Sequence, residues 1–163
     1  MDNSLSLAAI RGVQGQRAFY VAMMPYAAVA TILAPLASAR ESRIGRALNK
    51  ARVKPFAQFL TSNSPSVVVP SIHVAIDGCM GFEEVAESIS VGTLKIALDA
   101  PLMLIDGRHR VAAIAAALGQ RPYLDRETLP VCFHAHLGPE TAQQMFDTIN
   151  RRAIRPPRQK CEV

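Results

Sequence analysis

The sequence predicts an α+β domain in which helices flank a mixed sheet. The chain has 163 residues, enough for one domain with a proper core and too few for two full domains. Half of the residues are hydrophobic and 19% are charged, which excludes a disordered chain. Strand-like and helix-like segments follow in the order strand, helices, strands, helix, strand, helix. Because helices and strands are partly segregated, this order favours α+β over a doubly wound sheet.

The first predicted elements lie in residues 18–39, a stretch without charged residues. Residues 17–23 are apolar and β-prone, which predicts a strand ended by Pro25. Pro is well tolerated in the first turn of a helix, so residues 26–37 are predicted to be helical. A membrane span is the alternative. However, two prolines interrupt the stretch and its period changes at Pro25, which favours a strand followed by a buried helix.

Three further helices are predicted. Apolar residues at helical spacing indicate a helix over residues 44–60, which Pro55 is expected to kink or divide. Residues 108–118 form a clean helical segment with Gly119 as its expected C-cap. Residues 140–151 form the last predicted helix.

The remaining strands are recognised by short apolar or alternating runs. Asp77-Gly78 is a turn signal, strong for a hairpin if strands flank it. The acidic segment around Glu83, Glu84 and Glu87 suggests a helical turn. The predicted strands are residues 67–69, 72–76, 93–98, 102–105 and 129–137, of which 102–105 is continuously apolar and therefore expected to be buried.

The positive charge is concentrated in two blocks. The formal net charge of +5 favours anionic partners such as nucleic acid or nucleotides. The first block includes a single acidic residue, Glu41. It is interpreted either as an anion-facing surface or as a solvated helix face. A second block is interpreted as a basic tail. The first block contains Arg40, Arg43, Arg46, Lys50, Arg52 and Lys54, and the second contains Arg151, Arg152, Arg155, Arg158 and Lys160.

The cysteines and the N-terminus favour a cytoplasmic protein. Cys79, Cys132 and Cys161 are widely spaced, odd in number and not in a CxxC motif, which fits reduced thiols. The first residues lack the basic region of a signal peptide. His134 and His136 would share one face of a strand, but no third ligand has convincing spacing, so no metal site is predicted.

The most informative chemistry is the turn at residues 106–110, Asp-Gly-Arg-His-Arg, between a predicted buried strand and a predicted helix. The first N–H groups of a helix lack internal partners and carry partial positive charge, so they attract phosphate or carboxylate. Gly107 lets a ligand approach the backbone, and Arg108 and Arg110 add guanidinium donors. Acids are usually preferred at a helix start, so basic residues there point to function.

Asp106 and His109 have alternative roles. Asp106 is either the N-cap of the following helix, a functional carboxylate, or both. His109 can donate a hydrogen bond or titrate near neutral pH. If the chain is an enzyme, Asp106 or His109 is the candidate catalytic base. The chain has no Walker A, GxGxxG, GxSxG or HExxH motif.

Residues 106–110 resemble the Asp-Gly-Gln-His-Arg signature of the DGQHR-domain family, with Arg108 in place of the usual Gln. The likeness extends in order along the chain. Residues 13–20 look like the family's opening strand, and residues 69–72 like its central strand. Residues 145–151 resemble the Phe-x-x-Ile/Leu-Asn segment that follows the signature.

The resemblance implies a fold related to the ParB/sulfiredoxin-like group, where the equivalent turn cradles nucleotide phosphates. It implies a DGQHR domain over residues 1–155 and a basic tail over residues 156–163. It also implies that the chain is truncated relative to longer members of the family. The implied phosphate- or nucleotide-binding residues are Gly107, Arg108, Arg110, Gln16, Arg17 and Asn150. The basic block supplies the candidate DNA-binding residues Arg43, Arg46, Lys50, Arg52 and Lys54.

The implied function is that of an accessory or regulatory protein of DNA phosphorothioate (sulfur) modification. Its expected partners are DNA and other DNA sulfur-modification proteins, and a homo-oligomer is left open. The alternative is a nucleotide-hydrolysing or phosphotransfer enzyme that uses ATP or another nucleoside triphosphate with Mg²⁺. A third hypothesis is a structural partner whose helix at residues 26–37 forms an interface, which a large exposed apolar patch on that helix would support.

Overall fold

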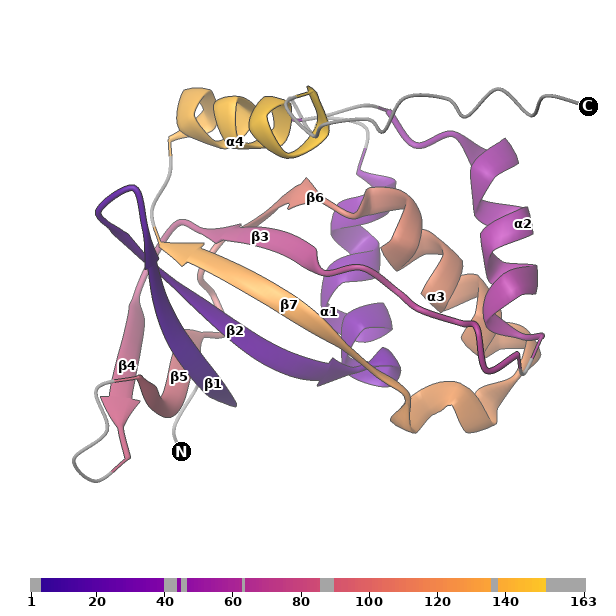
Figure 1. Ribbon diagram of the computed structural model, residues 1–163, viewed down its shortest axis with the longest axis horizontal. Helices are drawn as coiled ribbons and strands as arrows, with labels where there is room; N and C mark the ends of the chain where they lie inside the picture. The colour runs from indigo at the N-terminus through magenta and orange to yellow at the C-terminus, as the bar shows by residue number, and fades with distance from the viewer. Residues whose placement is uncertain are drawn as a thin grey trace, which may run out of the picture.

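The computed structural model describes residues 4–39, 44, 47–62, 64–85, 90–135 and 138–151. Within these residues the chain forms one seven-stranded sheet, four α-helices and a short 3-10 helix, η1, which confirms the predicted α+β class (Figure 1). The strands are β1 (Ser4–Gln14), β2 (Arg17–Pro25), β3 (Ile72–Ile76), β4 (Met80–Glu84), β5 (Val91–Ala97), β6 (Leu102–Asp106) and β7 (Thr128–Ala135). The helices are α1 (Tyr26–Ser38), α2 (Lys50–Leu60), α3 (Arg108–Gln120), η1 (Pro122–Arg126) and α4 (Pro139–Arg151).

The sheet is open and mixed. Its strand order is β4-β5-β1-β2-β7-β3-β6. In the described part of the sheet, β3 and β7 form the one parallel pair, and the other neighbours are antiparallel. β6 is therefore an edge strand, and the turn that follows it lies at the border of the sheet.

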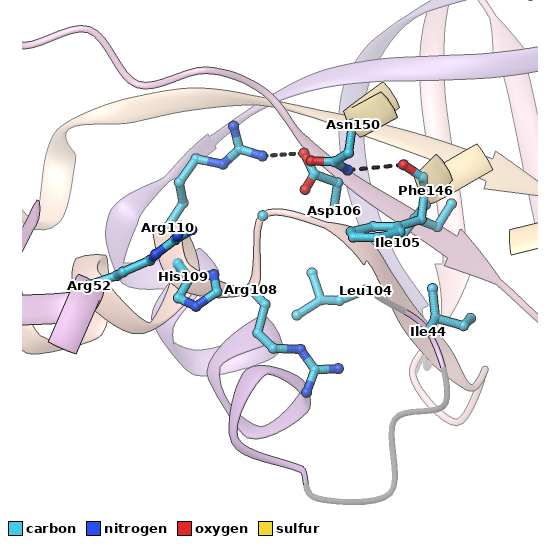
Figure 2. A pocket seen from close by; sticks show the side chains of 11 residues that line it. Ile44, Arg52, Leu104, Ile105, Asp106, Arg108, His109, Arg110, Phe146 and Asn150 are labelled. Atoms are coloured by element: carbon cyan, nitrogen blue, oxygen red, sulfur yellow. Dashed lines mark hydrogen bonds and ion pairs between the residues drawn. The ribbon is translucent and has the colours of Figure 1, made fainter. Parts of the chain in front are cut away.

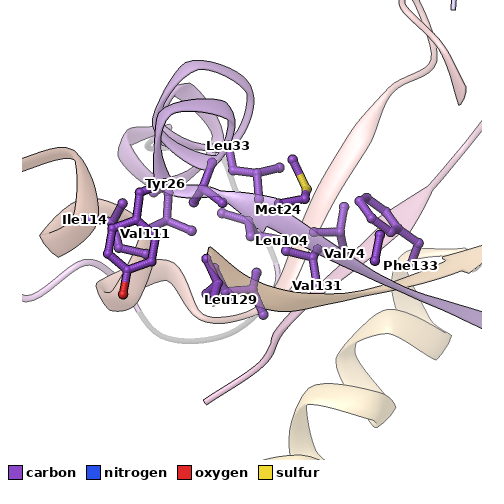
Figure 3. Close-up of a cluster of buried hydrophobic side chains, with 14 of the residues drawn as sticks. Met24, Tyr26, Leu33, Val74, Leu104, Val111, Ile114, Leu129, Val131 and Phe133 are labelled. Carbon is purple, nitrogen blue, oxygen red and sulfur yellow. The ribbon is translucent and has the colours of Figure 1, made fainter. Parts of the chain in front are cut away.

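The helices lie on both faces of the sheet. In Figure 1, α1, α2 and α3 gather on the right of the view, and α4 lies across the top by itself. Alternate residues of β3 and β6 contribute to two separate cores. Val74 and Leu104 join the large core with α1 and α3, whereas Ala75 and Ile105 join a small core with α4. Figure 3 shows the large core, in which side chains of α1 and α3 meet those of the sheet.

The first hairpin was only partly anticipated. The predicted strand at residues 17–23 is confirmed as β2, but its partner β1 was not predicted. Gly15 and Gln16 connect the two strands, and both have positive φ values, as a tight two-residue hairpin turn requires. The alternation of Ser4-Leu5-Ser6-Leu7 was a signal that could have revealed β1, because Leu5 and Leu7 pack against the large core.

The prediction for the second helix was wrong at its start. α1 is confirmed, but α2 begins at Lys50 rather than at residue 44, because Asn49 caps it by accepting a hydrogen bond from the Ala51 N–H. Pro55 does not divide α2, which continues as one helix to Leu60. Apolar spacing alone did not reveal the cap that begins the helix.

Four other expectations need correction. Residues 67–69 are not a strand, because pairing begins only at Ile72. Asp77-Gly78 does not close a hairpin, because β4 pairs with β5 and not with β3. The segment with Glu83 and Glu84 belongs to β4 rather than to a helical turn, and Glu87 lies outside the described residues. α3 continues through Gly119 to Gln120, so Gly119 is not its C-cap.

The other predicted elements are confirmed. β5, β6, β7 and α4 lie where strands and a helix were expected, within a few residues at each end. None of the helices in the described part is long and apolar enough to cross a membrane.

Candidate phosphate cleft

The site is built at the turn from β6 to α3. β6 ends at Asp106, Gly107 takes a left-handed conformation with φ of 107°, and α3 begins at Arg108. A Cβ atom on residue 107 would lie 2.9 Å from Cγ1 of Ile72 on β3. Position 107 therefore requires glycine for two reasons: its φ is positive, and its backbone packs closely on β3.

A cleft of about 230 Å³ opens at this turn, and we call it the phosphate cleft (Figure 2). The turn and β6 form its floor, and α2 and α4 supply residues at its sides. Three arginines and one carboxylate line it, so its net charge is positive. The lining residues are Ile44, Arg52, Leu104, Ile105, Asp106, Gly107, Arg108, His109, Arg110, Phe146 and Asn150.

Asp106 pairs with Arg110 instead of capping α3. The N-cap position of α3 is Gly107, and no side-chain hydrogen bond caps it, so of the alternatives left open for Asp106 the N-cap role is excluded. Oδ2 of Asp106 instead accepts a hydrogen bond from Nη2 of Arg110 at 2.5 Å. Both side chains are largely buried, with 18% and 19% of their surfaces exposed. The pair orients the Arg110 guanidinium at the cleft and offsets part of its charge.

Arg108 points away from this ion pair. Its Nη1 donates to the Ala39 carbonyl oxygen at 3.3 Å, directly after the end of α1. Its Nη2 is buried and has no hydrogen-bond partner among the described residues. Burial lowers the pKa of Arg108, yet a guanidinium stays charged at neutral pH. Among the described residues, one strong donor at this side of the cleft is therefore left unsatisfied.

His109 joins the cleft to α2. Its Nε2 accepts a hydrogen bond from the Asn49 N–H at 2.9 Å, so the ring is neutral and carries its proton on Nδ1. Burial first, and then the neighbouring Arg52 and Arg108, lower the pKa of His109. Because Asn49 is the N-cap of α2, His109 fixes the beginning of the helix that places Arg52 at the cleft.

The structure brings only some of the other predicted site residues together. Asn150 lines the phosphate cleft, where its Nδ2 donates to the Phe146 carbonyl oxygen. Gln16 and Arg17 do not line it, because they lie at the β1–β2 turn. Lys50 and Lys54 are exposed on α2 without lining the cleft. The predicted DNA-binding residues Arg43 and Arg46 lie outside the described residues.

A second, larger cavity of about 450 Å³ lies between α4 and the sheet, and we call it the histidine cavity. His73 of β3, His134 of β7 and Arg17 line it. His134 was noted from the sequence, whereas His73 was not. No local motif marks His73, and its position within the predicted strand 72–76 was the one available signal. The described residues contain no group of three or more His, Cys, Asp or Glu side chains arranged to hold a metal, and His136 is outside them.

The chain was then compared with known proteins. The family model described as "DndB: DNA-sulfur modification-associated" matches residues 7–159. Searches of curated proteins and of solved structures returned no match. The family match covers almost the whole chain and includes both the turn at residues 106–110 and the histidine cavity, so the family resemblance seen in the sequence is confirmed. The chain belongs to the DndB family of DNA-sulfur modification-associated proteins.

Proposed function

We propose that this chain is an accessory or regulatory protein of DNA phosphorothioate modification that holds a phosphate group of DNA in the phosphate cleft. Family membership supplies the association with DNA sulfur modification. The observation that carries the proposal is the charge of the cleft, where Arg52, Arg108 and Arg110 surround the start of α3 and Asp106 is the one carboxylate among the described lining residues.

The helix terminus adds to this charge. α3 has no acidic residue in its first turn and no side chain that caps its N-terminus, so its first N–H groups are available to an anion. The volume of about 230 Å³ is below the roughly 300–1,000 Å³ typical of drug-sized ligands. The size therefore favours one compact anionic group, such as a phosphate of a DNA strand or of a nucleotide.

α2 extends the positive surface beyond the cleft. Lys50 and Lys54 are exposed one helical turn apart, and Arg52 reaches the cleft from the same helix. Residues two apart on an α-helix point to nearly opposite sides, so these lysines would meet phosphates that pass around α2 rather than those beside Arg52. Such contacts position DNA without reading its sequence.

The alternative is a nucleotide-hydrolysing or phosphotransfer activity with Asp106 and His109 as catalytic residues. Asp106 lines the cleft, which favours this idea. However, Asp106 is paired with Arg110, and His109 accepts a hydrogen bond from Asn49. Mg²⁺ is usually held by one or two carboxylates together with substrate phosphates. The described lining offers Mg²⁺ only a carboxylate that Arg110 already engages, so these contacts favour binding over catalysis.

The test is a DNA-binding titration at several salt concentrations with wild type, Arg52→Gln and the control Arg126→Gln. Arg126 is an exposed arginine of η1, beyond the far end of α3 from the cleft. Wild-type affinity should fall steeply between about 50 and 200 mM salt because DNA releases counterions on binding. Arg52→Gln should weaken binding to all sequences alike and reduce the slope of log affinity against log salt by about 1. Arg126→Gln should match wild type.

Two outcomes would contradict the proposal. Affinity that does not change with salt would exclude phosphate contacts, and equal loss in both variants would exclude the cleft as their location. Phosphate release from ATP with Mg²⁺ that Asp106→Asn abolishes would instead support the enzymatic alternative.

A further inference from the structure

The histidine cavity lies beside the region where α4 packs on the sheet. α4 packs on β6 through a small core that includes Ala142, Phe146 and Ile149. Figure 1 shows α4 crossing above β3, β6 and β7. Beside its contact with β6, the space between α4 and the strands is a cavity of about 450 Å³. This volume lies within the roughly 300–1,000 Å³ of typical small-molecule sites, unlike that of the phosphate cleft.

The floor of the cavity is a row of three aromatic rings on adjacent strands. Phe19 of β2 and His134 of β7 are register partners, with ring centroids 6.1 Å apart and planes inclined by 23°. The rings of His134 and His73 follow, with centroids 5.4 Å apart and an inclination of 14°. Gly12 of β1 makes room for the row, because a Cβ atom there would lie 2.5 Å from the Phe19 ring. The ring planes along the row are thus nearly parallel.

The two histidines form a hydrogen-bonded chain. Nδ1 of His73 lies 3.1 Å from Nε2 of His134, and Nε2 of His73 lies 3.4 Å from the hydroxyl of Ser71. Whichever ring donates, both nitrogens of His73 and one nitrogen of His134 are engaged. Nδ1 of His134 has no hydrogen-bond partner among the described residues, and it is not one of their buried unpartnered atoms. His134 lines the cavity, so this nitrogen is open to a ligand there.

The other walls supply neutral polar groups and one cation. α4 contributes Thr141, Gln144 and Thr148, and the first hairpin contributes Gln14 and Arg17. Gln144 and Arg17 are exposed, and no partner for either side chain is found in the described part of the chain. The cavity therefore combines an aromatic floor, amide and hydroxyl groups, and a guanidinium.

We propose that the histidine cavity binds a nucleobase. A nucleobase has a flat π-face for the aromatic row and an edge of donors and acceptors for Nδ1 of His134 and the amide of Gln144. Nδ1 of His134 is a donor in one tautomer and an acceptor in the other, so it suits either kind of edge atom. Arg17 is placed to meet the phosphate attached to the base. This second site is separate from the phosphate cleft, and its ligand is either a free nucleotide or a base that has left the DNA stack.

Uncharged nucleosides test this site by itself, because they carry no phosphate for the phosphate cleft. Calorimetric titrations would use adenosine, guanosine, cytidine and thymidine with wild type, His134→Phe and Gln144→Ala. His134→Phe retains an aromatic ring and removes Nδ1, whereas Gln144→Ala changes an exposed side chain. We expect at least one nucleoside to bind wild type, and each variant to weaken it by roughly threefold to tenfold, the effect of one lost hydrogen bond.

The controls are Gln120→Ala, at the exposed end of α3, and Arg52→Gln, in the phosphate cleft. Both should bind the nucleoside like wild type, and His134→Phe should retain the salt dependence of DNA binding, which the phosphate cleft supplies. Failure of this inference is thereby distinguished from failure of the proposed function. Absence of binding for all four nucleosides, or unchanged affinity in Gln144→Ala and His134→Phe, would overturn it.

The two sources of the base are separated with a duplex that contains 2-aminopurine, whose fluorescence rises when it leaves the stack. A rise with wild type that is lost in His134→Phe would identify the ligand as an unstacked DNA base. Nucleoside binding without such a rise would identify it as a free nucleotide. Either result would support the cavity as a nucleobase site.

Discussion

Gly107 is the residue on which the shape of the phosphate cleft depends. It ends β6, turns the chain with a φ of 107° and lets α3 begin with its N–H groups directed at the cleft. Its backbone lies so close to Ile72 that a single methyl group would displace β3 or the turn. The same residue therefore serves the packing of the sheet and the accessibility of the helix terminus.

Gly107→Ala should lower the free energy of unfolding by about 2 kcal/mol, because alanine is strained at positive φ and its methyl group would collide with Ile72. For a chain of this size the melting temperature should fall by roughly 4–8 °C, which circular dichroism can measure. The matched control is Gly119→Ala, at a helical position with open space. It should raise stability by about 0.5–1 kcal/mol. Similar effects of the two substitutions would show that Gly107 is not under this constraint.

Arg108 stands where the Asp-Gly-Gln-His-Arg signature has Gln, and it contacts a different helix from the rest of the turn. Its guanidinium contacts the end of α1 through the Ala39 carbonyl and does not join the Asp106–Arg110 pair. An arginine near a helix C-terminus is electrostatically favourable. The replacement of Gln by Arg therefore bears on how α3 packs against α1 as well as on the charge of the cleft.

At the scale of elements, α2 depends on α3 for its position. The His109 ring of α3 accepts a hydrogen bond from the residue that caps α2, and Arg52 follows within the first turn. α2 and α3 also pack along their lengths. The basic surface of α2 is thus placed by the signature turn, although about 60 residues separate them along the chain.

His109→Ala should loosen the first turn of α2. The Asn49 N–H loses its acceptor, so the amides at the start of α2 should exchange with solvent roughly threefold to tenfold faster. Hydrogen exchange measured by NMR would detect this, with the amides of α4 as internal control. Because burial and neighbouring arginines lower the pKa of His109, its neutral form persists as pH falls through the ordinary histidine range and is lost only below that range, at the lowered pKa. Wild-type α2 should therefore loosen on acidification, and uniform exchange across α2 and α4 would contradict this.

At the scale of the whole molecule, β3 and β7 join the two parts of the sheet. β4, β5, β1, β2 and β7 form one antiparallel series, and the parallel contact of β7 with β3 adds the β3–β6 pair that carries the phosphate cleft. The His73–His134 hydrogen bond crosses this junction. α4 contributes residues to both the phosphate cleft and the histidine cavity, so one helix forms a wall of each site.

Acid should destabilise the molecule at this junction. Burial, and to a smaller extent the neighbouring His73, lowers the pKa of His134 to about 4. Burial also lowers the pKa of His73, with Asp106 opposing this change and Arg110 adding to it. An unfolded chain binds these protons near pH 6.5, so the stability from the neutral rings is complete above that pH and is lost as pH falls toward about 4.

The measurement is the melting temperature of wild type and His134→Phe between about pH 7 and pH 4. The wild-type value should fall across this range, and the decline should be shallower in His134→Phe, which has no proton to bind at residue 134. Parallel curves for the two proteins would show that His134 does not contribute to the acid sensitivity.

Much of the fold and part of the site could be predicted from the sequence. The charge-free stretch around Pro25 revealed β2 and α1, and the apolar run before Asp106-Gly107 revealed β6, the turn and α3. These features depend on residues next to one another, whose periodicity and turn chemistry act locally. The same local reasoning misplaced the start of α2 and left the role of Asp106 open, because a cap and an ion pair depend on side-chain orientation.

By itself, the sequence determined the α+β class, the family and the cationic turn at residues 106–110. Only the tertiary structure decided that Arg17 and Asn150 line different cavities, and that His73 meets His134 across 61 residues. The physical reason is that strand order brings these residues together. The order of a sheet is set by the burial of whole faces and by long-range pairing, and no local pattern in the chain encodes it.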